Sequence, residues 1–219
     1  MTDSDKLIAF QGAPGAYSNL ACLSAFPEMT PLPCTSFEGA FRAVEDGEAK
    51  YAMIPIENSI AGRVADIHHL LPATGLHIVG EHFEPVRHFL MAPEGASFDT
   101  IKRVRSHVHA LGQCKLAIRE LGLQAIVHVD TAGAAADLEH STDLEECAIA
   151  SSLAAEIYGL KVLRGEMEDH AYNTTRFIVL AREPQSPELG DGVAVTTFVF
   201  RVRNVAAALY KAMGGFATN

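Results

Sequence analysis

The chain has 219 residues, 48% of them hydrophobic and 20% charged, so it can bury a substantial core and is not globally disordered. Its formal net charge of −10 argues against nucleic acid or an anionic membrane as a partner. The N-terminal residues are polar and acidic, unlike a signal peptide, and no apolar run is long enough to span a membrane. We therefore expect one large domain, or one domain plus a fragment.

The cysteine and histidine patterns bear on location and metal binding. The four cysteines form no Cys-x-x-Cys pair, which favours reduced thiols in a cytoplasmic protein. The pairs His68-His69 and His107-x-His109 have no third ligand at a diagnostic spacing. We therefore expect no metal, and we interpret these histidines as surface or packing residues.

In chain order, apolar runs alternate with segments of helical spacing. The first part of the chain is predicted to form strands at residues 7–10, 51–56, 77–80 and 86–91 and helices at 18–26, 37–46 and 64–71. The glycine-containing turn at residues 12–15, between the first strand and helix, can direct backbone N–H groups at an anion or be an ordinary turn. It does not match a dinucleotide or nucleoside-triphosphate motif.

The pattern continues in the second part of the chain. Strands are expected at residues 103–106, 125–129, 147–150, 161–163 and 178–180, and helices at 116–121, from 130 onward and at 153–158. The alternation predicts an α/β fold with largely parallel sheets. Strands that cross near residues 82–87 and 169–173 predict two lobes with a cleft between them, lined by the polar stretches that follow strands.

The C-terminal part has a different organisation. Residues 184–192 contain proline, glycine and acidic residues and are interpreted as a linker. A strand at residues 194–202 and a helix at 205–213 follow. Because a lone strand and helix cannot bury their faces unaided, we expect part of a second domain, cut short or completed by another chain.

The strongest candidate for chemistry is Thr175-Arg176-Phe177, where a loop enters a buried strand. Thr175 offers a mobile O–H donor, Arg176 a guanidinium fork that matches a carboxylate, and Phe177 an apolar face. Together they suit a small, anionic, ring-containing substrate. The alternative is a strand start with a surface arginine. Asn58 and Ser59, after an earlier strand, either cap a helix or face the same ligand.

Motifs spread over nearly all of the chain resemble those of the prephenate dehydratase family. They are Gly12-Ala13-Pro14-Gly15-Ala16-Tyr17-Ser18, Ile54-Pro55-Ile56-Glu57-Asn58-Ser59, Gly62-x-Val64, Ser106-His107, Gln113-Cys114, Asp130-Thr131-Ala132-Gly133-Ala134-Ala135 and Asn173-Thr174-Thr175-Arg176-Phe177. The segment from Ala194 to Thr218 resembles the first strand and helix of an ACT regulatory domain. Val108-His109 departs from the Pro-Gln that is common in the family.

The resemblance implies an α/β fold with two lobes, like a type II periplasmic binding protein. It implies a catalytic domain at residues 1–183, with lobe one at about 1–82 plus 171–183 and lobe two at about 83–170, and a partial ACT domain at 193–219. It also implies conversion of prephenate to phenylpyruvate, water and carbon dioxide in phenylalanine biosynthesis. That reaction needs no cofactor.

The resemblance assigns Thr175 the main catalytic role, with Asn58 and Gln113 as neutral donors. The substrate-binding residues that we expect are Arg176, Phe177, Ser59, Gly62, Ser106, His107, Thr131, Ala132 and Gly133. A direct role for His107 stays open, since a backbone bond could satisfy it. Cys114 is interpreted as a buried thiol rather than a reactive one.

Two alternatives stay open at this stage. The first is an arogenate dehydratase, whose substrate carries an amino group in place of the keto group. The second is a non-catalytic protein that binds a small acid. The family implies a homodimer or homotetramer, with phenylalanine as an allosteric ligand of the full-length protein.

Overall fold

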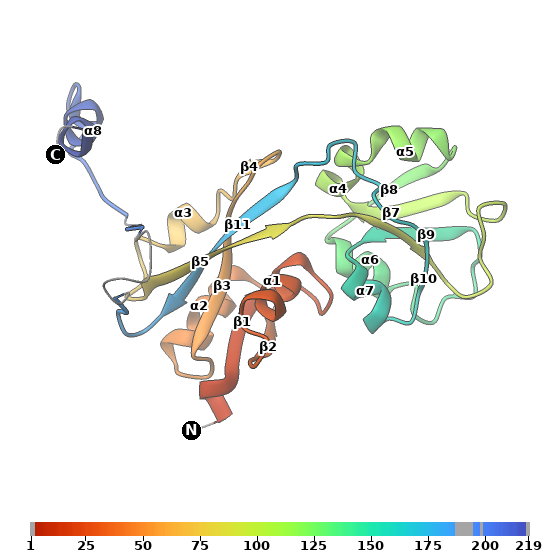
Figure 1. Cartoon of the computed structure of the whole chain (residues 1–219), viewed down its shortest axis with the longest axis horizontal. Coiled ribbons are helices and arrows are strands. Elements are labelled where there is room, and N and C mark those ends of the chain that lie inside the picture. The colour runs from red at the N-terminus through yellow and green to blue at the C-terminus, as the bar shows by residue number, and fades with distance from the viewer. Residues whose placement is uncertain (1–2, 187–194, 198, 218–219) are drawn as a thin grey trace. The chain divides into compact units, whose positions relative to one another are not determined.

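The computed structural model describes residues 3–186, 195–197 and 199–217. Two compact units are present, Met1–Ser186 and Pro187–Asn219. The first unit contains two β-sheets, each covered by helices, which form two lobes (Figure 1). Within the described ranges, no helix is long and apolar enough to cross a membrane.

The first lobe is built on a sheet in the order β2-β1-β3-β11-β5, with β4 beside β3. Its strands are β1 (Leu7–Gln11), β2 (Thr30–Cys34), β3 (Tyr51–Asn58), β4 (Gly62–Arg63), β5 (His77–Pro85) and β11 (Thr174–Ala181). Its helices are the 3-10 helix η1 (Asp3–Lys6), α1 (Tyr17–Ala25), α2 (Phe37–Glu45) and α3 (Ile67–Leu70). Strands β2, β1 and β3 are parallel, whereas β11 runs antiparallel between β3 and β5.

The second lobe is built on a sheet in the order β10-β6-β9-β7-β8. Its strands are β6 (Phe89–Ala92), β7 (Arg103–His107), β8 (Gln124–His128), β9 (Glu146–Ala150) and β10 (Lys161–Arg164). Its helices are α4 (Val108–Gln113), α5 (Lys115–Glu120), α6 (Thr131–Ala136) and α7 (Ser152–Ile157). Strands β8, β7 and β9 are parallel, and β6 and β10 are antiparallel to their neighbours.

Both sheets are therefore mixed, which corrects the prediction of largely parallel sheets. In each lobe the three strands joined through helices are parallel, and the first strand after each lobe crossing, β6 or β11, runs in the opposite direction. Strand β2 was not predicted from the sequence, and Pro31 and Pro33 argue against a strand there. An edge position explains β2, since a proline there loses no hydrogen bond within the sheet.

Two segments cross between the lobes, residues 86–88 and 165–173. They are hydrogen-bonded to one another, from Val86 N to Asn173 O at 2.8 Å and from Met167 N to His88 O at 3.0 Å. The lobes are thus joined by a paired connection rather than by two independent linkers.

A further contact between the lobes lies at the loop before α1. The Ser151 hydroxyl donates to Gly15 O at 2.5 Å and also accepts from Ala154 N at 3.1 Å, which caps α7. Gly15 has φ +87°, and a Cβ there would lie 2.7 Å from the Cα of Ala154. Only glycine therefore fits this close approach without a shift.

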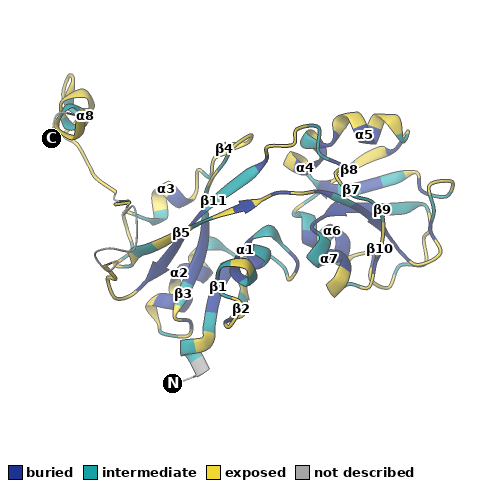
Figure 2. Ribbon diagram, viewed as in Figure 1, coloured by how far each residue is buried: buried dark blue, intermediate teal, exposed yellow. Residues whose placement is uncertain are grey.

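The core of each lobe lies between its sheet and its helices. Figure 2 shows buried residues concentrated on the central strands of both sheets. In the first lobe, Phe10, Met53 and Phe177 belong to one buried cluster, which packs on α1. In the second lobe, Leu90 and Ile149 pack among residues of α4 and α5.

The second unit contains helix α8 (Ala208–Ala217), close to the helix predicted at 205–213. The strand predicted at residues 194–202 is wrong for the described part of that range, because residues 195–197 and 199–202 have no strand conformation. A strand needs a hydrogen-bonded neighbour, and no described segment pairs with these residues. Most of the predicted linker lies outside the described residues. The ACT domain stays a prediction.

Candidate active site

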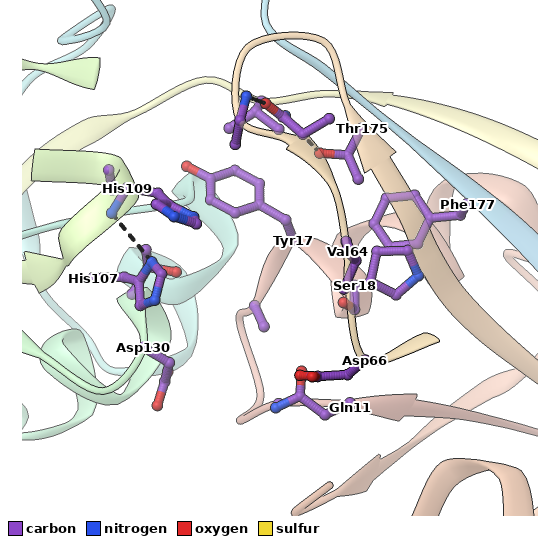
Figure 3. A pocket seen from close by; sticks show the side chains of 18 of the residues that line it. Gln11, Tyr17, Ser18, Val64, Asp66, His107, His109, Asp130, Thr175 and Phe177 are labelled. Carbon is purple, nitrogen blue, oxygen red and sulfur yellow. Dashed lines mark hydrogen bonds between the residues drawn. The ribbon is translucent and has the colours of Figure 1, made fainter. Parts of the chain in front are cut away.

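A cavity of about 610 Å³ lies between the two lobes of the first unit. Its size suits a small ligand. The chemistry-bearing residues that line it are Gln11, Tyr17, Ser18, Asn58, Arg63, Asp66, His88, His107, His109, Gln113, Asp130, Thr131 and Thr175. Figure 3 shows Thr175 and His107 facing this space from opposite sides, with the Tyr17 ring between them.

Strand β11 presents its first residues alternately to the cavity and away from it. Thr175 and Phe177, both expected to contact the substrate, line the cavity, and Phe177 is also part of the buried core. Arg176 does not line it. Its guanidinium donates to Glu81 at 2.7 and 3.0 Å and to Glu57 at 3.3 Å. Because successive side chains of a strand point to opposite faces, Arg176 lies away from the cavity that Thr175 and Phe177 line, and its expected carboxylate-binding role stays a prediction.

Asn58, at the end of β3, holds the Thr175 hydroxyl. Its Nδ2 donates to Thr175 Oγ1 at 3.0 Å and to Asn173 Oδ1 at 2.7 Å. Its Oδ1 accepts from the backbone N–H groups of Ile60 and Ala61, at 3.0 and 2.8 Å. The asparagine is therefore oriented by the turn that follows β3, and it orients Thr175 in turn.

Gln113 reaches the cavity from the end of α4. Its Oε1 accepts from Asn173 Nδ2 at 2.9 Å and lies 2.8 Å from His88 Nε2. No described side chain or backbone group accepts from the Gln113 amide nitrogen. This leaves an N–H₂ donor for a ligand. Gln113 was predicted from the sequence, whereas Asn173 and His88, which hold it, were not.

His88 is 2% exposed and lies in the first crossing segment. Its Nδ1 lies 2.7 Å from the hydroxyl of Tyr17, which is also 2.8 Å from Arg87 O. Burial lowers the pKa of His88, although its hydrogen bond to Gln113 and the charge of Glu168 act in the opposite direction. The ring is therefore neutral near pH 7.

The cavity wall on the side of the second lobe is formed by the residues that follow β7 and β8. His107 ends β7, and its Nδ1 accepts from His109 N at 3.3 Å. This bond leaves Nε2–H as a donor when the ring is neutral. Desolvation and the neighbouring His109 lower the pKa of His107. Asp130 caps α6 through Gly133 N at 2.5 Å and exposes Thr131 to the cavity.

Besides Arg176, four residues that we expected to bind substrate do not line the cavity. The Ser59 hydroxyl donates to Tyr172 O at 3.1 Å, and the Ser106 hydroxyl donates to Ile149 O at 2.5 Å inside the second lobe. Ala132 is fully buried, and the Gly133 N–H is taken by Asp130. These four residues hydrogen-bond to or pack against other protein groups rather than facing the cavity. Gly62, by contrast, lines the cavity.

Arg63 is the one arginine or lysine among the described residues that line the cavity. It is exposed in β4, and the described residues include no ion-pair partner for it. It was not predicted from the sequence, although it is the unnamed position of Gly62-x-Val64. It is the available cation for an anionic ligand, whereas Arg176 is neutralised by two carboxylates.

The described residues include no metal-binding cluster, and Cys114 is a poor candidate for a nucleophile. The described part of the chain contains no group of three or more histidine, cysteine or acidic residues that could hold a metal ion. Cys114 is fully buried, and desolvation raises its pKa, as do the nearby Asp169 and Glu168. A protonated, enclosed thiol is a poor nucleophile.

Together these features define a protein of two α/β lobes around a polar cavity, which contains a positioned hydroxyl, neutral amide donors and the cation of Arg63. The family model of prephenate dehydratase matches residues 8–185. The chain belongs to the prephenate dehydratase family. The predicted family, the two-lobed α/β fold class and the lyase class of enzyme are thereby confirmed.

Individual relatives agree with the family match. The chain is 49% identical to a bifunctional N-acyl-homoserine lactone acylase/prephenate dehydratase of Komagataeibacter europaeus, over 99% of this chain and 77% of that protein. It is 44% identical to arogenate dehydratase/prephenate dehydratase 1 of Arabidopsis thaliana, over 98% of this chain. It spans 55% of that plant protein, about half of its length.

Solved structures show the same fold. A prephenate dehydratase from Arthrobacter aurescens in complex with L-Phe has a TM-score of 0.85 and 29% identity, over 97% of this chain and 72% of that one. A protein described as a novel type of quorum-quenching acylase has a TM-score of 0.86 and 48% identity, over 97% of this chain and 77% of that one.

Proposed function

We propose that this chain converts prephenate to phenylpyruvate, water and carbon dioxide. The single observation that carries the proposal is the Thr175 hydroxyl, which is held by Asn58 at 3.0 Å and faces the cavity between the lobes. The ring carboxylate leaves as carbon dioxide, and its bonding electrons aromatise the ring as the C–O bond breaks. The departing hydroxide takes a proton and becomes water.

Thr175 donates that proton in our proposal. An aliphatic hydroxyl is a weak acid, so we propose a concerted donation in which solvent returns a proton to Thr175. General acid catalysis of this kind contributes about 10²–10⁴-fold. The Asn58 bond to Thr175 Oγ1 supports the developing negative charge on that oxygen, because a donor aimed at the oxygen stabilises it more as the proton leaves.

The substrate's side-chain carboxylate needs a cationic binding residue that does not also bind the ring carboxylate, which leaves. We propose that Arg63 binds the side-chain carboxylate, with the Gln113 amide and the His107 Nε2–H as further donors. Val64, Val86 and Phe177 supply apolar walls to the same cavity. A carboxylate beside such walls is poorly solvated, which favours its loss as neutral carbon dioxide.

Arogenate is the second candidate substrate, and the cavity contains an observation in its favour. Asp66 and Asp130 both line the cavity, and a carboxylate there can bind the ammonium group of arogenate. Several plant relatives carry arogenate dehydratase in their names. The keto group of prephenate is uncharged. Asp66 and Asp130 can therefore form an ion pair with arogenate but not with the keto group of prephenate.

The proposal is tested by incubating the protein with prephenate or arogenate and following product formation by absorbance. Calorimetric binding of each substrate is measured in parallel. We expect turnover of prephenate, and Asp66→Asn is expected to lower arogenate turnover more than prephenate turnover. Binding of both substrates without turnover of either would contradict the proposal and favour a non-catalytic binding protein.

Other sequence-based expectations stay predictions. We propose a cytoplasmic enzyme that forms a homodimer or homotetramer, works without a cofactor and responds to phenylalanine through an ACT domain. The L-Phe complex of the Arthrobacter aurescens relative supports phenylalanine as the ligand to test first. Size-exclusion chromatography with light scattering, with and without phenylalanine, measures both the assembly and its response.

A further inference from the structure

Six side chains form one continuous hydrogen-bonded chain across the first unit. It runs from Thr175 through Asn58, Asn173, Gln113 and His88 to Tyr17. Each link is 2.7–3.0 Å long. The chain involves β11, β3, both crossing segments, α4 and α1, so it connects both lobes.

The direction of the bonds from Asn58 to His88 follows from two backbone N–H groups that bind Asn58. Backbone N–H groups can only donate, so those of Ile60 and Ala61 require an oxygen opposite them. That oxygen is Asn58 Oδ1. The Asn58 amide nitrogen must then face Asn173 and Thr175. Both partners therefore accept from it, and Thr174 O is a third, longer acceptor at 3.4 Å.

The same reasoning extends to the second lobe. Since Asn173 Oδ1 accepts from Asn58, its amide nitrogen faces Gln113 and donates to Oε1. Gln113 presents that same oxygen to His88 Nε2 at 2.8 Å. Two acceptors at this distance would repel one another, so His88 Nε2 must carry a proton. The two backbone amides thus fix the protonated nitrogen of a histidine four side chains away.

The arrangement has a consequence at each end. Thr175 Oγ1 already accepts from Asn58, and no described group accepts its own proton, so the proton is free to point into the cavity. At the other end, His88 Nδ1 faces the Tyr17 hydroxyl at 2.7 Å. A neutral ring with its proton on Nε2 leaves Nδ1 as an acceptor for that hydroxyl.

We propose that the backbone amides of Ile60 and Ala61 set the direction of this hydrogen-bonded chain, which holds His88 as the Nε2–H tautomer and makes His88 and Asn173 positioning residues for Thr175 and Gln113. The catalytic part of this inference rests on the proposed function. Neither residue reacts in the proposal. They keep the Thr175 proton and the Gln113 N–H₂ group directed at the substrate.

A doubly protonated His88 is the competing arrangement. It would donate to both Gln113 and Tyr17, and the Tyr17 proton would pass to Arg87 O at 2.8 Å. Its charge would lie in a buried position, and the Glu168 carboxylate near it already bonds the His88 backbone N–H at 2.9 Å. Because burial of the ring disfavours the charged form, we infer the neutral tautomer, in which the Tyr17 hydroxyl shares its proton between His88 Nδ1 and Arg87 O.

The tautomer is measured directly by nitrogen–proton correlation NMR of ring-labelled histidine in the full chain, without substrate, near pH 7.5. The His88 signals are assigned by their loss in His88→Gln. We expect the pattern of a neutral ring protonated on Nε2. A neutral ring protonated on Nδ1, or an imidazolium, would overturn the inference, whether or not the protein turns over prephenate.

The positioning role is tested with Asn173→Asp, which replaces the donor opposite Gln113 Oε1 with an acceptor. We expect kcat for the better substrate to fall about 100-fold, as for a reacting group displaced by about 1 Å, and KM to change less than about threefold. A change in the His88 NMR pattern should accompany it. Unchanged kcat with an altered pattern would overturn the positioning role while leaving the proposed function intact.

Asn19→Asp is the matched control. Asn19 is also buried in the first unit, but its Oδ1 accepts from Gly15 N at 3.0 Å, and a carboxylate can accept the same bond. The substitution adds the same charge without reversing a hydrogen bond. We expect kcat within about threefold of the original protein and an unchanged His88 pattern, and an equal loss in both variants would overturn the positioning role.

Discussion

At the residue scale, the positive charge available to a ligand depends on which arginine is already paired with carboxylates. Arg176 donates to two carboxylates, one of them Glu81 at 2.7 Å, and lies on the face of β11 away from the cavity. Arg63 lines the cavity, and the described residues include no carboxylate that pairs with it. An anionic substrate bound to a chain with a formal net charge of −10 needs such a local cation.

We therefore predict that Arg63→Gln raises KM for prephenate about tenfold or more with little change in kcat, because it removes a contact made in both the bound and the transition state. Arg176→Gln is the matched control and should leave KM within about threefold. Steady-state kinetics of both variants checks the prediction. The opposite ranking would restore Arg176 as the carboxylate-binding residue.

Individual site residues were predicted unevenly from the sequence. Thr175, Asn58 and Gln113 were predicted as a group and converge on one cavity. The position of Arg176 could have been predicted from the alternation of side chains along a strand, since Thr175 and Phe177 share the opposite face. Neither Asn173 nor Tyr17 was assigned a role, although both stand within the quoted motifs.

At the scale of the elements, the loop before α1 and the start of α7 are fitted closely together. Gly15 has φ +87°, and a Cβ added to it would lie only 2.7 Å from the Cα of Ala154. We predict that Gly15→Ala lowers the free energy of unfolding by about 1–3 kcal/mol, because the added methyl group overpacks this contact. Urea unfolding followed by circular dichroism measures the change.

Gly112→Ala serves as the control for that substitution. Gly112 lies in α4, and a Cβ there would have no heavy atom within 4 Å. Alanine is favoured over glycine inside a helix by up to about 1 kcal/mol, so this variant should be equally stable or slightly more stable. Equal destabilisation in both variants would show that the Gly15 contact has no special role.

Element prediction succeeded where a segment's own pattern decides its conformation and failed where a neighbour does. The apolar run at residues 178–180 belongs to β11, as expected. Strand β2 was missed because its prolines are acceptable only at a sheet edge, which the sequence does not specify. The described part of residues 194–202 has strand-like residues but no strand neighbour among the described segments.

At the scale of the whole molecule, two histidines with lowered pKa values couple folding to pH. Desolvation lowers the pKa of both His88 and His107 below the usual value of 6.5. The unfolded chain therefore binds more protons than the folded chain between those lowered values and about 6.5. Stability rises with pH in this window, so it falls as the protein is acidified below about pH 7.

We predict that His88→Gln makes the free energy of unfolding less dependent on pH across that window, because it removes one group that the unfolded state protonates first. Urea unfolding at several pH values measures the slope. Glu145 does not affect this window, since hydrogen bonds from Lys102 and Arg103 lower its pKa from 4.5. An unchanged slope in His88→Gln would contradict the effect assigned to His88.

The two-lobed organisation was predicted from the order of strands and helices alone, and the α/β class is confirmed. The direction of the strands was predicted less well, because it depends on how the chain returns after each crossing. His88 lies outside all of the quoted motifs. Its role follows only from the fold, which brings both crossing segments into contact with α1 and α4.

The central claim is that the Thr175 hydroxyl donates the proton that converts the leaving hydroxide to water. The most direct measurement is the single-turnover rate of prephenate conversion by Thr175→Ala and Thr175→Ser, with calorimetric binding of prephenate to each. We predict a loss of about 10²–10⁴-fold for alanine, with binding nearly retained, and a much smaller loss for serine, which keeps the hydroxyl. A full rate in Thr175→Ala would contradict the claim.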